Sequence, residues 1–320
     1  MISLVQLGTV DYATGLRLQE QLVALRKEEK IPDVLLLLEH SPVITLGRNA
    51  KAANVIASPE LLTRRGVELF ECDRGGDVTF HGLGQIVGYP IFDLRGFSAA
   101  DGKRKTLGAV EFVRRLEEVL IRTCADFAIP TKRVPGLTGV WTDPPNGALP
   151  ILSFRAEEND SQNRSLESRN LLPADAVTEH VGTVALRQAQ GRLSAVQRSA
   201  ASAPDHGPEA KLAAIGVHIS RFVTSHGFAL NVNTDLSYFN LIIPCGITAK
   251  PVTSMQQELG KPLDLNAVAE SISRNFGTVF SSQMLWVETL DALLGRTVGV
   301  PMKLPAELKK LHKEDGTAWA

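Results

Sequence analysis

The 320-residue sequence is poor in cysteine, carries almost no net charge and contains no long apolar run. Its three cysteines, Cys72, Cys124 and Cys245, are widely separated and odd in number, which disfavours a disulfide framework and favours a reducing compartment. No CxxC pair is present, so a zinc or redox site of that type is excluded. We therefore expect a cytoplasmic protein with free thiols. We also expect neither a bound metal nor a cofactor.

Because positive and negative residues nearly balance, the protein cannot attract a partner through its net charge. Lys and Arg number 34 against 35 Asp and Glu, so neither nucleic acid nor a membrane surface is an expected partner. The longest apolar run, residues 34–38, is too short to cross a bilayer, which needs about 20 residues. The N-terminus lacks a basic start and a cleavage pattern, so it is expected to form a strand rather than a signal peptide. We expect a monomer.

Hydrophobic periodicity indicates a mixture of helices and strands. Helices are predicted over 11–29, with Asp11 as a cap, and over 108–127, 263–280 and 287–294. Strands are predicted at 34–38, 42–47, 67–72, 85–94, 134–141, 212–219 and 228–232. Because these elements show no regular βαβ alternation, they favour an α/β (α+β) fold in which a mixed β-sheet is flanked by helices.

One stretch differs in composition from the rest. Residues 155–221 contain no Phe, Tyr or Trp, and polar or small residues dominate 156–168 and 199–208. Such segments bury too little apolar surface to offset the entropy of ordering. We predict a main domain over 1–260, interrupted by a mostly disordered insertion at 153–208 with a short helix near 181–197, and a helical extension of that domain over 261–320. The alternative is that 153–208 is a regular part of the fold.

A glycine-rich segment at 74–90 has the composition of a ligand-binding loop. Its glycines allow the backbone to approach a ligand closely, while Arg74, Thr79 and His81 supply hydrogen-bonding groups. The segment is neither a GxGxxG nor a GxxxxGK[ST] motif. A β-hairpin with glycines at bulges has the same composition, and composition does not separate the two interpretations.

Cys245 is a candidate nucleophile because it lies between Pro244 and Gly246 after an apolar run. A turn at the end of a strand exposes a side chain while it holds the backbone rigid. The alternative is a small buried apolar residue, which we expect of Cys124 on the apolar face of its helix and of Cys72 in its strand.

The segments that begin at Lys211 and at Thr224 do not indicate a function by themselves. A lysine such as Lys211 at the start of an apolar strand is usually a solvated end residue, and it is functional only beside a group whose ionisation it alters. Gly227 is expected at a turn entering a strand, where its backbone lines a pocket. His218 and His226 are expected to be structural.

Taken in order, four segments resemble the lipoyl(octanoyl) transferase family. They are RGGxxTFHxxGQxVxYP at 74–90, KxAAIG at 211–216, HGFALN at 226–231 and NxIxPCG at 240–246. The similarity covers roughly 1–152 and 209–260, and the insertion at 153–208 departs from the compact pattern of the family. The resemblance implies a fold like that of biotin and lipoate protein ligases.

The resemblance also implies an activity and a set of site residues. Members of the family transfer an octanoyl group from octanoyl-acyl carrier protein to a lysine of apo lipoyl domains, in 2-oxoacid dehydrogenases and the glycine cleavage H protein, as the first step of endogenous lipoate synthesis. Cys245 is then the catalytic residue that forms a thioester, and Lys211 either stabilises its thiolate or accepts a proton from the attacking amine. His81 and backbone N–H groups are candidates to hold the oxyanion. The residues expected to line the acyl pocket are Arg74, Gly75, Gly76, Asp77, Val78, Thr79, Phe80, His81, Ala214, Ile215, Gly216, Gly227, Phe228 and Ala229.

Three alternatives remain open at the level of sequence. An ATP-dependent lipoate or biotin protein ligase has a related fold but needs a nucleotide site and no cysteine nucleophile. An amidotransferase that moves octanoyl groups between protein lysines shares both fold and cysteine. A non-catalytic binding module is the third alternative.

Overall fold

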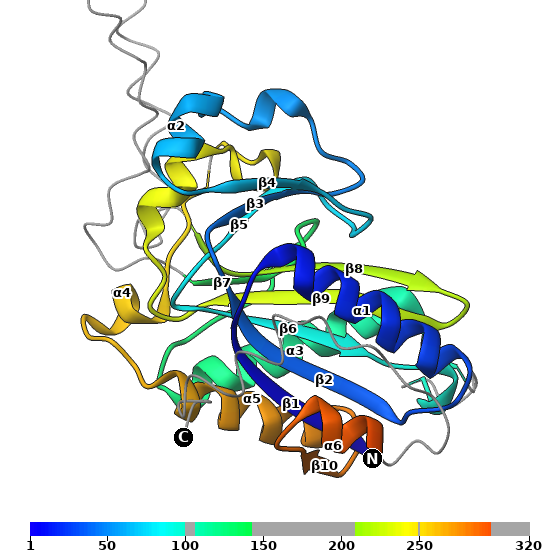
Figure 1. Cartoon of the computed structure of the whole chain (residues 1–320). Coiled ribbons are helices and arrows are strands. Elements are labelled where there is room, and N and C mark those ends of the chain that lie inside the picture. The colour runs from blue at the N-terminus through cyan, green and yellow to red at the C-terminus, as the bar shows by residue number, and fades with distance from the viewer. Residues whose placement is uncertain (100–105, 143–208, 249, 296–320) are drawn as a thin grey trace, which may run out of the picture. The chain divides into compact units, whose positions relative to one another are not determined.

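The computed structural model describes residues 1–99, 106–142, 209–248 and 250–295 (Figure 1). The predicted insertion at 153–208, and the helix predicted near 181–197 within it, lie outside the described residues. Residues 296–320 of the predicted C-terminal extension lie outside them as well. The proposed domain division therefore stays a prediction.

A seven-stranded mixed sheet forms the centre of the fold, with strand order β10-β1-β2-β6-β9-β8-β7 (Figure 1). β1 is parallel to β2 and to β10, whereas every neighbouring pair from β2 to β7 is antiparallel. This arrangement confirms the predicted fold class. The strands are β1 Ile2–Val10, β2 Asp33–His40, β6 Gln85–Ile91, β7 Val140–Thr142, β8 Ala210–Ser220, β9 Val223–Asn231 and β10 Met284–Trp286.

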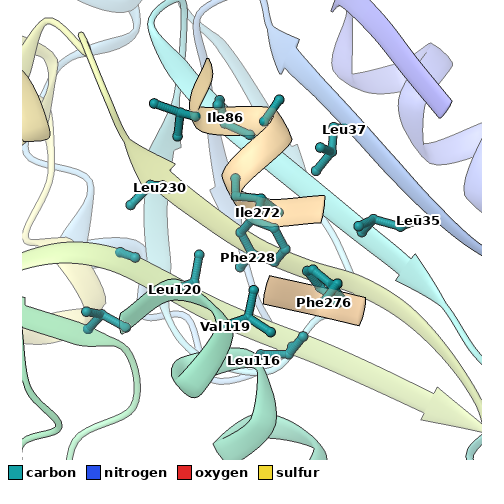
Figure 2. Packing of buried hydrophobic residues seen from close by; sticks show 14 of the residues in the cluster. Leu35, Leu37, Ile86, Leu116, Val119, Leu120, Phe228, Leu230, Ile272 and Phe276 are labelled. Atoms are coloured by element: carbon teal, nitrogen blue, oxygen red, sulfur yellow. The ribbon is translucent and has the colours of Figure 1, made fainter. Parts of the chain in front are cut away.

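Helices cover both faces of this sheet. One face packs against α1 (Tyr12–Lys27) and the other against α3 (Ala109–Asp126) and α5 (Leu265–Val279) (Figure 1). Leu35 and Leu37 of β2 pack with α3 and α5 in the cluster of Figure 2, whereas Leu36 faces α1. Because both faces of β2 are buried, its sequence is a continuous apolar run rather than an alternation. The shorter helices are α2 Pro59–Arg64, α4 Met255–Leu259 and α6 Leu290–Gly295.

A second, three-stranded sheet has the order β4-β3-β5. Its own small core includes Val78, Phe80 and Phe239. The strands are β3 Val43–Leu46, β4 Glu68–Glu71 and β5 Val78–His81. The short 3₁₀ helices of the described residues are η1 Ala52–Asn54, η2 Leu94–Gly96, η3 Leu236–Leu241 and η4 Pro244–Gly246.

Most predicted elements are confirmed, and three predictions are wrong in detail. Residues 134–139 form a loop rather than a strand, with Gly139 at a φ of 120°. Gly227 lies in the middle of β9 rather than at a turn; a Cβ there would lie 2.0 Å from the Gly88 oxygen, so this glycine marks a close approach of two strands. The C-terminal segment also contributes strand β10 to the large sheet.

Candidate active site

A pocket of about 210 Å³ is bordered by the loop before β5 and by strands β6, β8 and β9. It contains Lys211 and Cys245, the two residues that were expected to be catalytic. The predicted pocket residues that line it are Arg74, Gly75, Gly76, Asp77, Thr79, His81, Ala214, Ile215, Gly216, Gly227, Phe228 and Ala229. Four segments that are distant in sequence therefore meet at one cavity.

Val78 and Phe80 do not line this pocket, contrary to expectation. Successive side chains of a strand point to opposite faces, so Thr79 and His81 face the pocket when Val78 and Phe80 face away. These two side chains are buried in the core of the small sheet.

Sequence reasoning missed several lining residues. Val87 and Tyr89 lie two positions apart on β6, inside the recognised 74–90 motif, so the strand period is the signal that identifies them. Tyr12 enters from the start of α1, and no local pattern marks it because only the tertiary fold brings it there. The others are Gly136, Leu137, Thr138, His226 and Ile247.

The Cys245 turn has an unusual backbone. Cys245 has φ 56° and ψ 19°, in the left-handed region, which for a residue with a side chain costs on the order of 1 kcal/mol. The turn is held by a 2.7 Å hydrogen bond from the Ile243 N–H to the Asn54 carbonyl and by a 3.0 Å bond from the Ile247 N–H to the Pro244 carbonyl. The thiol is thus presented from a rigid elbow, as the sequence predicted.

Asp77 links the pocket loop to this elbow. Its Oδ2 accepts a 2.6 Å hydrogen bond from Asn54 Nδ2, and its Oδ1 accepts from the Lys51 and Val78 N–H groups at 3.2 and 2.8 Å. A Cβ on Gly246 would lie 2.8 Å from Asp77 Oδ2. Only glycine allows the elbow to pack this closely against the carboxylate.

Lys211 lies directly beside Cys245. Its Nζ donates to the Sγ at 3.1 Å, and the residue is only 8% exposed. Its backbone pairs with the segment that follows the elbow, through a 2.8 Å bond from its N–H to the Pro251 carbonyl and a 3.0 Å bond from the Thr253 N–H to its own carbonyl. These two bonds bring the lysine strand and the cysteine turn together.

His81 is neutral and its tautomer is set by a chain of hydrogen bonds. Burial lowers its pKa to about 3. Gln85 Nε2 must be a donor, because the Phe80 carbonyl at 3.2 Å only accepts; Gln85 Oε1 therefore accepts from His81 Nδ1 at 2.7 Å. His81 Nε2 then carries a lone pair, which disfavours the expectation that it donates a hydrogen bond to an oxyanion.

Two other polar groups at the pocket serve the scaffold. The Arg74 guanidinium donates to the Thr45 carbonyl at 2.6 Å and to the Gly75 carbonyl at 3.1 Å, so it fixes the pocket loop to β3. Asp73, which precedes that loop, is held by His226 at 2.6 Å and by His218 at 2.5 Å. Both histidines thus bind Asp73, and His226 also lines the pocket, so their purely structural role stays a prediction.

Two further features are absent from the described residues. They contain no group of three or more His, Cys, Asp or Glu side chains arranged to hold a metal ion. None of the described helices is long and apolar enough to span a membrane.

Residues 11–277 match the model of the lipoyl protein ligase A/B catalytic domain family. The chain belongs to this family. Among curated lipoyl protein ligase A/B relatives, the octanoyltransferase of Koribacter versatilis is 50% identical over 98% of each chain. That of Acidobacterium capsulatum is 47% identical over 92% of this chain and 96% of its own, and that of Solibacter usitatus 42% over 88% and 93%. These similarities confirm the resemblance read from the four motifs.

Solved structures of the lipoyl protein ligase A/B type confirm the predicted fold. A bipartite lipoate protein ligase from Thermoplasma acidophilum superposes with a TM-score of 0.54 over 92% of this chain and 89% of that one, at 10% identity. A lipoate-protein ligase A bound with ATP gives a TM-score of 0.53 over 93% of both chains, at 11% identity. At such identities the likeness concerns the fold alone.

Proposed function

We propose that this protein is an octanoyltransferase of the cytoplasm that works through a covalent Cys245 thioester. The observation that carries the proposal is the 3.1 Å contact between Lys211 Nζ and Cys245 Sγ inside a pocket. The octanoyltransferase names of relatives up to 50% identical support the reaction and its place in lipoylation. The three free cysteines fit a reducing compartment.

The reaction proceeds in two balanced steps. The Cys245 thiolate attacks the carbonyl carbon of octanoyl-acyl carrier protein, and the carrier thiol leaves with the electrons of the broken C–S bond and takes up a proton. The amine of an apo lipoyl-domain lysine then attacks the enzyme thioester, loses a proton and releases the Cys245 thiolate. One thioester replaces another at little cost, and formation of the amide drives the second step, so no ATP is needed.

The site residues divide this work between them. An ammonium beside a thiol stabilises the reactive thiolate, which is the part proposed for Lys211. The octanoyl chain occupies the pocket between the Arg74–Thr79 loop and the β8 and β9 strands. The acceptors are the lipoyl domains of 2-oxoacid dehydrogenases and the glycine cleavage H protein.

An ATP-dependent ligase is the second candidate, because a solved ligase with ATP shares the fold. Such a ligase has no need of a thiol next to an ammonium at the pocket, so the Lys211–Cys245 contact favours transfer. Turnover of free octanoate that requires ATP would reverse this choice.

The test is intact mass spectrometry after mixing with octanoyl-acyl carrier protein. We expect one added octanoyl group in the parent chain and in Cys72→Ser, and none in Cys245→Ser. The Cys72→Ser variant is the matched control because Cys72 is also a partly exposed thiol, whereas burial raises the pKa of Cys124 to about 12. An adduct that persists in Cys245→Ser would refute the assignment, and an unchanged single-turnover rate in Lys211→Ala would remove Lys211 from the chemistry.

A further inference from the structure

Trp141 packs its indole ring against the Lys211 ammonium. The Lys211 Nζ lies 4.9 Å from the ring centroid, and the two residues are register partners on the adjacent strands β7 and β8. A shift of register between Val140 and Trp141 marks an irregularity in this pairing, the kind of distortion that re-aims a side chain. Gly139 also packs against the lysine stem, since a Cβ on Gly139 would lie 3.1 Å from Lys211 Cε.

The ammonium groups near this indole lie over its ring face, and its N–H group makes no hydrogen bond to them. Trp141 is 1% exposed, and its Nε1 has no hydrogen-bond partner among the residues that the structure describes. A buried tryptophan normally satisfies that N–H. Here two ammonium groups lie by the ring, Lys211 and, at 5.8 Å, Lys250.

The two lysines differ in how their charge is compensated. Lys250 forms an ion pair with Glu209, which also binds Lys132 at 3.1 Å. Within 1–99, 106–142, 209–248 and 250–295, no carboxylate lies in ion-pair range of Lys211. Its polar side-chain partners there are therefore the Trp141 ring and the Cys245 sulfur.

We propose that Trp141 is a positioning residue that directs the Lys211 Nζ at the Cys245 Sγ, in a position where a carboxylate would instead form an ion pair with the lysine. An aromatic face attracts an ammonium but has no comparable attraction for a neutral amine. A carboxylate in that position would cancel the field at the thiol. Of the two roles left open for Lys211, this arrangement favours stabilisation of the thiolate. The inference rests on the covalent role proposed for Cys245.

Other polar and charged groups near the pair are unchanged in every variant. Arg74, Asp77 and the neutral His81 line the same pocket, and the ion-paired Glu209 and Lys250 lie close to the Trp141 side of the pair.

The experiment follows alkylation of Cys245 by iodoacetamide as a function of pH, in the full chain carrying Cys72→Ser. Trp141→Leu removes the aromatic face, and we expect the midpoint of the pH profile to move to higher pH with a rate at pH 7 that falls roughly tenfold. Trp141→Phe keeps a weaker face and should shift the midpoint less. In a Lys211→Met background, Trp141→Leu should cause no further shift.

Val140→Ala is the matched control, since Val140 is also fully buried on β7 but packs into the core beside α3. It should lower thermal stability and leave the midpoint in place. An unmoved midpoint in Trp141→Leu, or a rate lowered equally at every pH, would overturn the inference; if that variant does not fold, the same criterion applies to Trp141→Phe. Because alkylation needs no acyl donor, a shifted midpoint in a chain that forms no octanoyl adduct would refute the proposed function and leave this inference intact.

Discussion

Glu117 connects the helical core to Lys211, and we expect its replacement to affect both the stability of the fold and the rate of acylation. This fully buried α3 side chain accepts from the Gly139 N–H at 3.1 Å through Oε1. Its Oε2 pairs with Arg114 at 2.6 Å and with Arg133 at 3.1 Å. Gly139 in turn packs against the stem of Lys211, so the Glu117 carboxylate helps to fix the position of the lysine side chain.

The expected loss of unfolding free energy depends on which of these Glu117 contacts are buried. The arginine side chains are 47% and 36% exposed, so each ion pair is screened and contributes at most about 1 kcal/mol. The bond from Gly139 to a buried charged acceptor is worth roughly 1.5–3 kcal/mol. Glu117→Gln keeps an acceptor oxygen and should cost about 1–2 kcal/mol, whereas Glu117→Leu leaves the Gly139 N–H unpaired and should cost about 3–5 kcal/mol.

Urea unfolding measures the stability and single-turnover acylation measures the effect on the site. We expect Glu117→Leu to acylate roughly tenfold more slowly than the parent under conditions where it is folded, because a displaced lysine loses its alignment with the thiol. Glu117→Gln should acylate at nearly the parental rate. Two results would refute this reasoning: equal stability of the two variants, or parental acylation by folded Glu117→Leu. Either would show that the Glu117–Gly139 bond does not position Lys211.

Two further predictions concern the elbow and the buried histidines. Gly246→Ala should slow acylation and lower stability by about 1–2 kcal/mol, because Gly246 has a φ of 68° and its Cβ would meet Asp77; Gly96→Ala, with open space around it and no positive φ, should be neutral. Burial lowers the pKa of His40 to about 4 and that of His81 to about 3, so below pH ~6.5 the unfolded chain binds more protons than the folded one. The free energy of unfolding in urea should therefore fall by a few kcal/mol from pH 7 to pH 5, and a constant value would contradict the neutral state of these two rings.

Local sequence patterns correctly predicted the helices and strands that have a single, regular pattern of buried residues. The α1 and α3 helices and the apolar β2 run were identifiable because helical spacing and a short continuous apolar run are each typical of one kind of buried element. The 134–139 segment was misassigned because its apolar residues and glycines suit a strand equally well. The loop is bonded to the helical core through the Gly139 N–H and Glu117, a contact that no local pattern encodes.

The two residues proposed as catalytic could be named from the sequence, whereas the contacts that hold them in place could not. Cys245 and Lys211 were located through motifs, and motifs carry residue types in order along the chain. Trp141 lies outside the four recognised segments, and its relation to Lys211 depends on the pairing of β7 with β8. Val78 and Phe80 show the opposite error, because a motif marks every residue of a strand while only one face of that strand reaches the pocket.

Lys211 is held in place by paired segments on both of its sides. On one side β8 pairs with β7, where Thr142 and Ala210 are the last register partners and Trp141 and Lys211 are the pair before them. Lys211 is held from its other side by Pro251 and Thr253, and β8 continues along the full length of β9. The ammonium, the indole and the thiol are therefore aligned by contacts among residues that the structure describes.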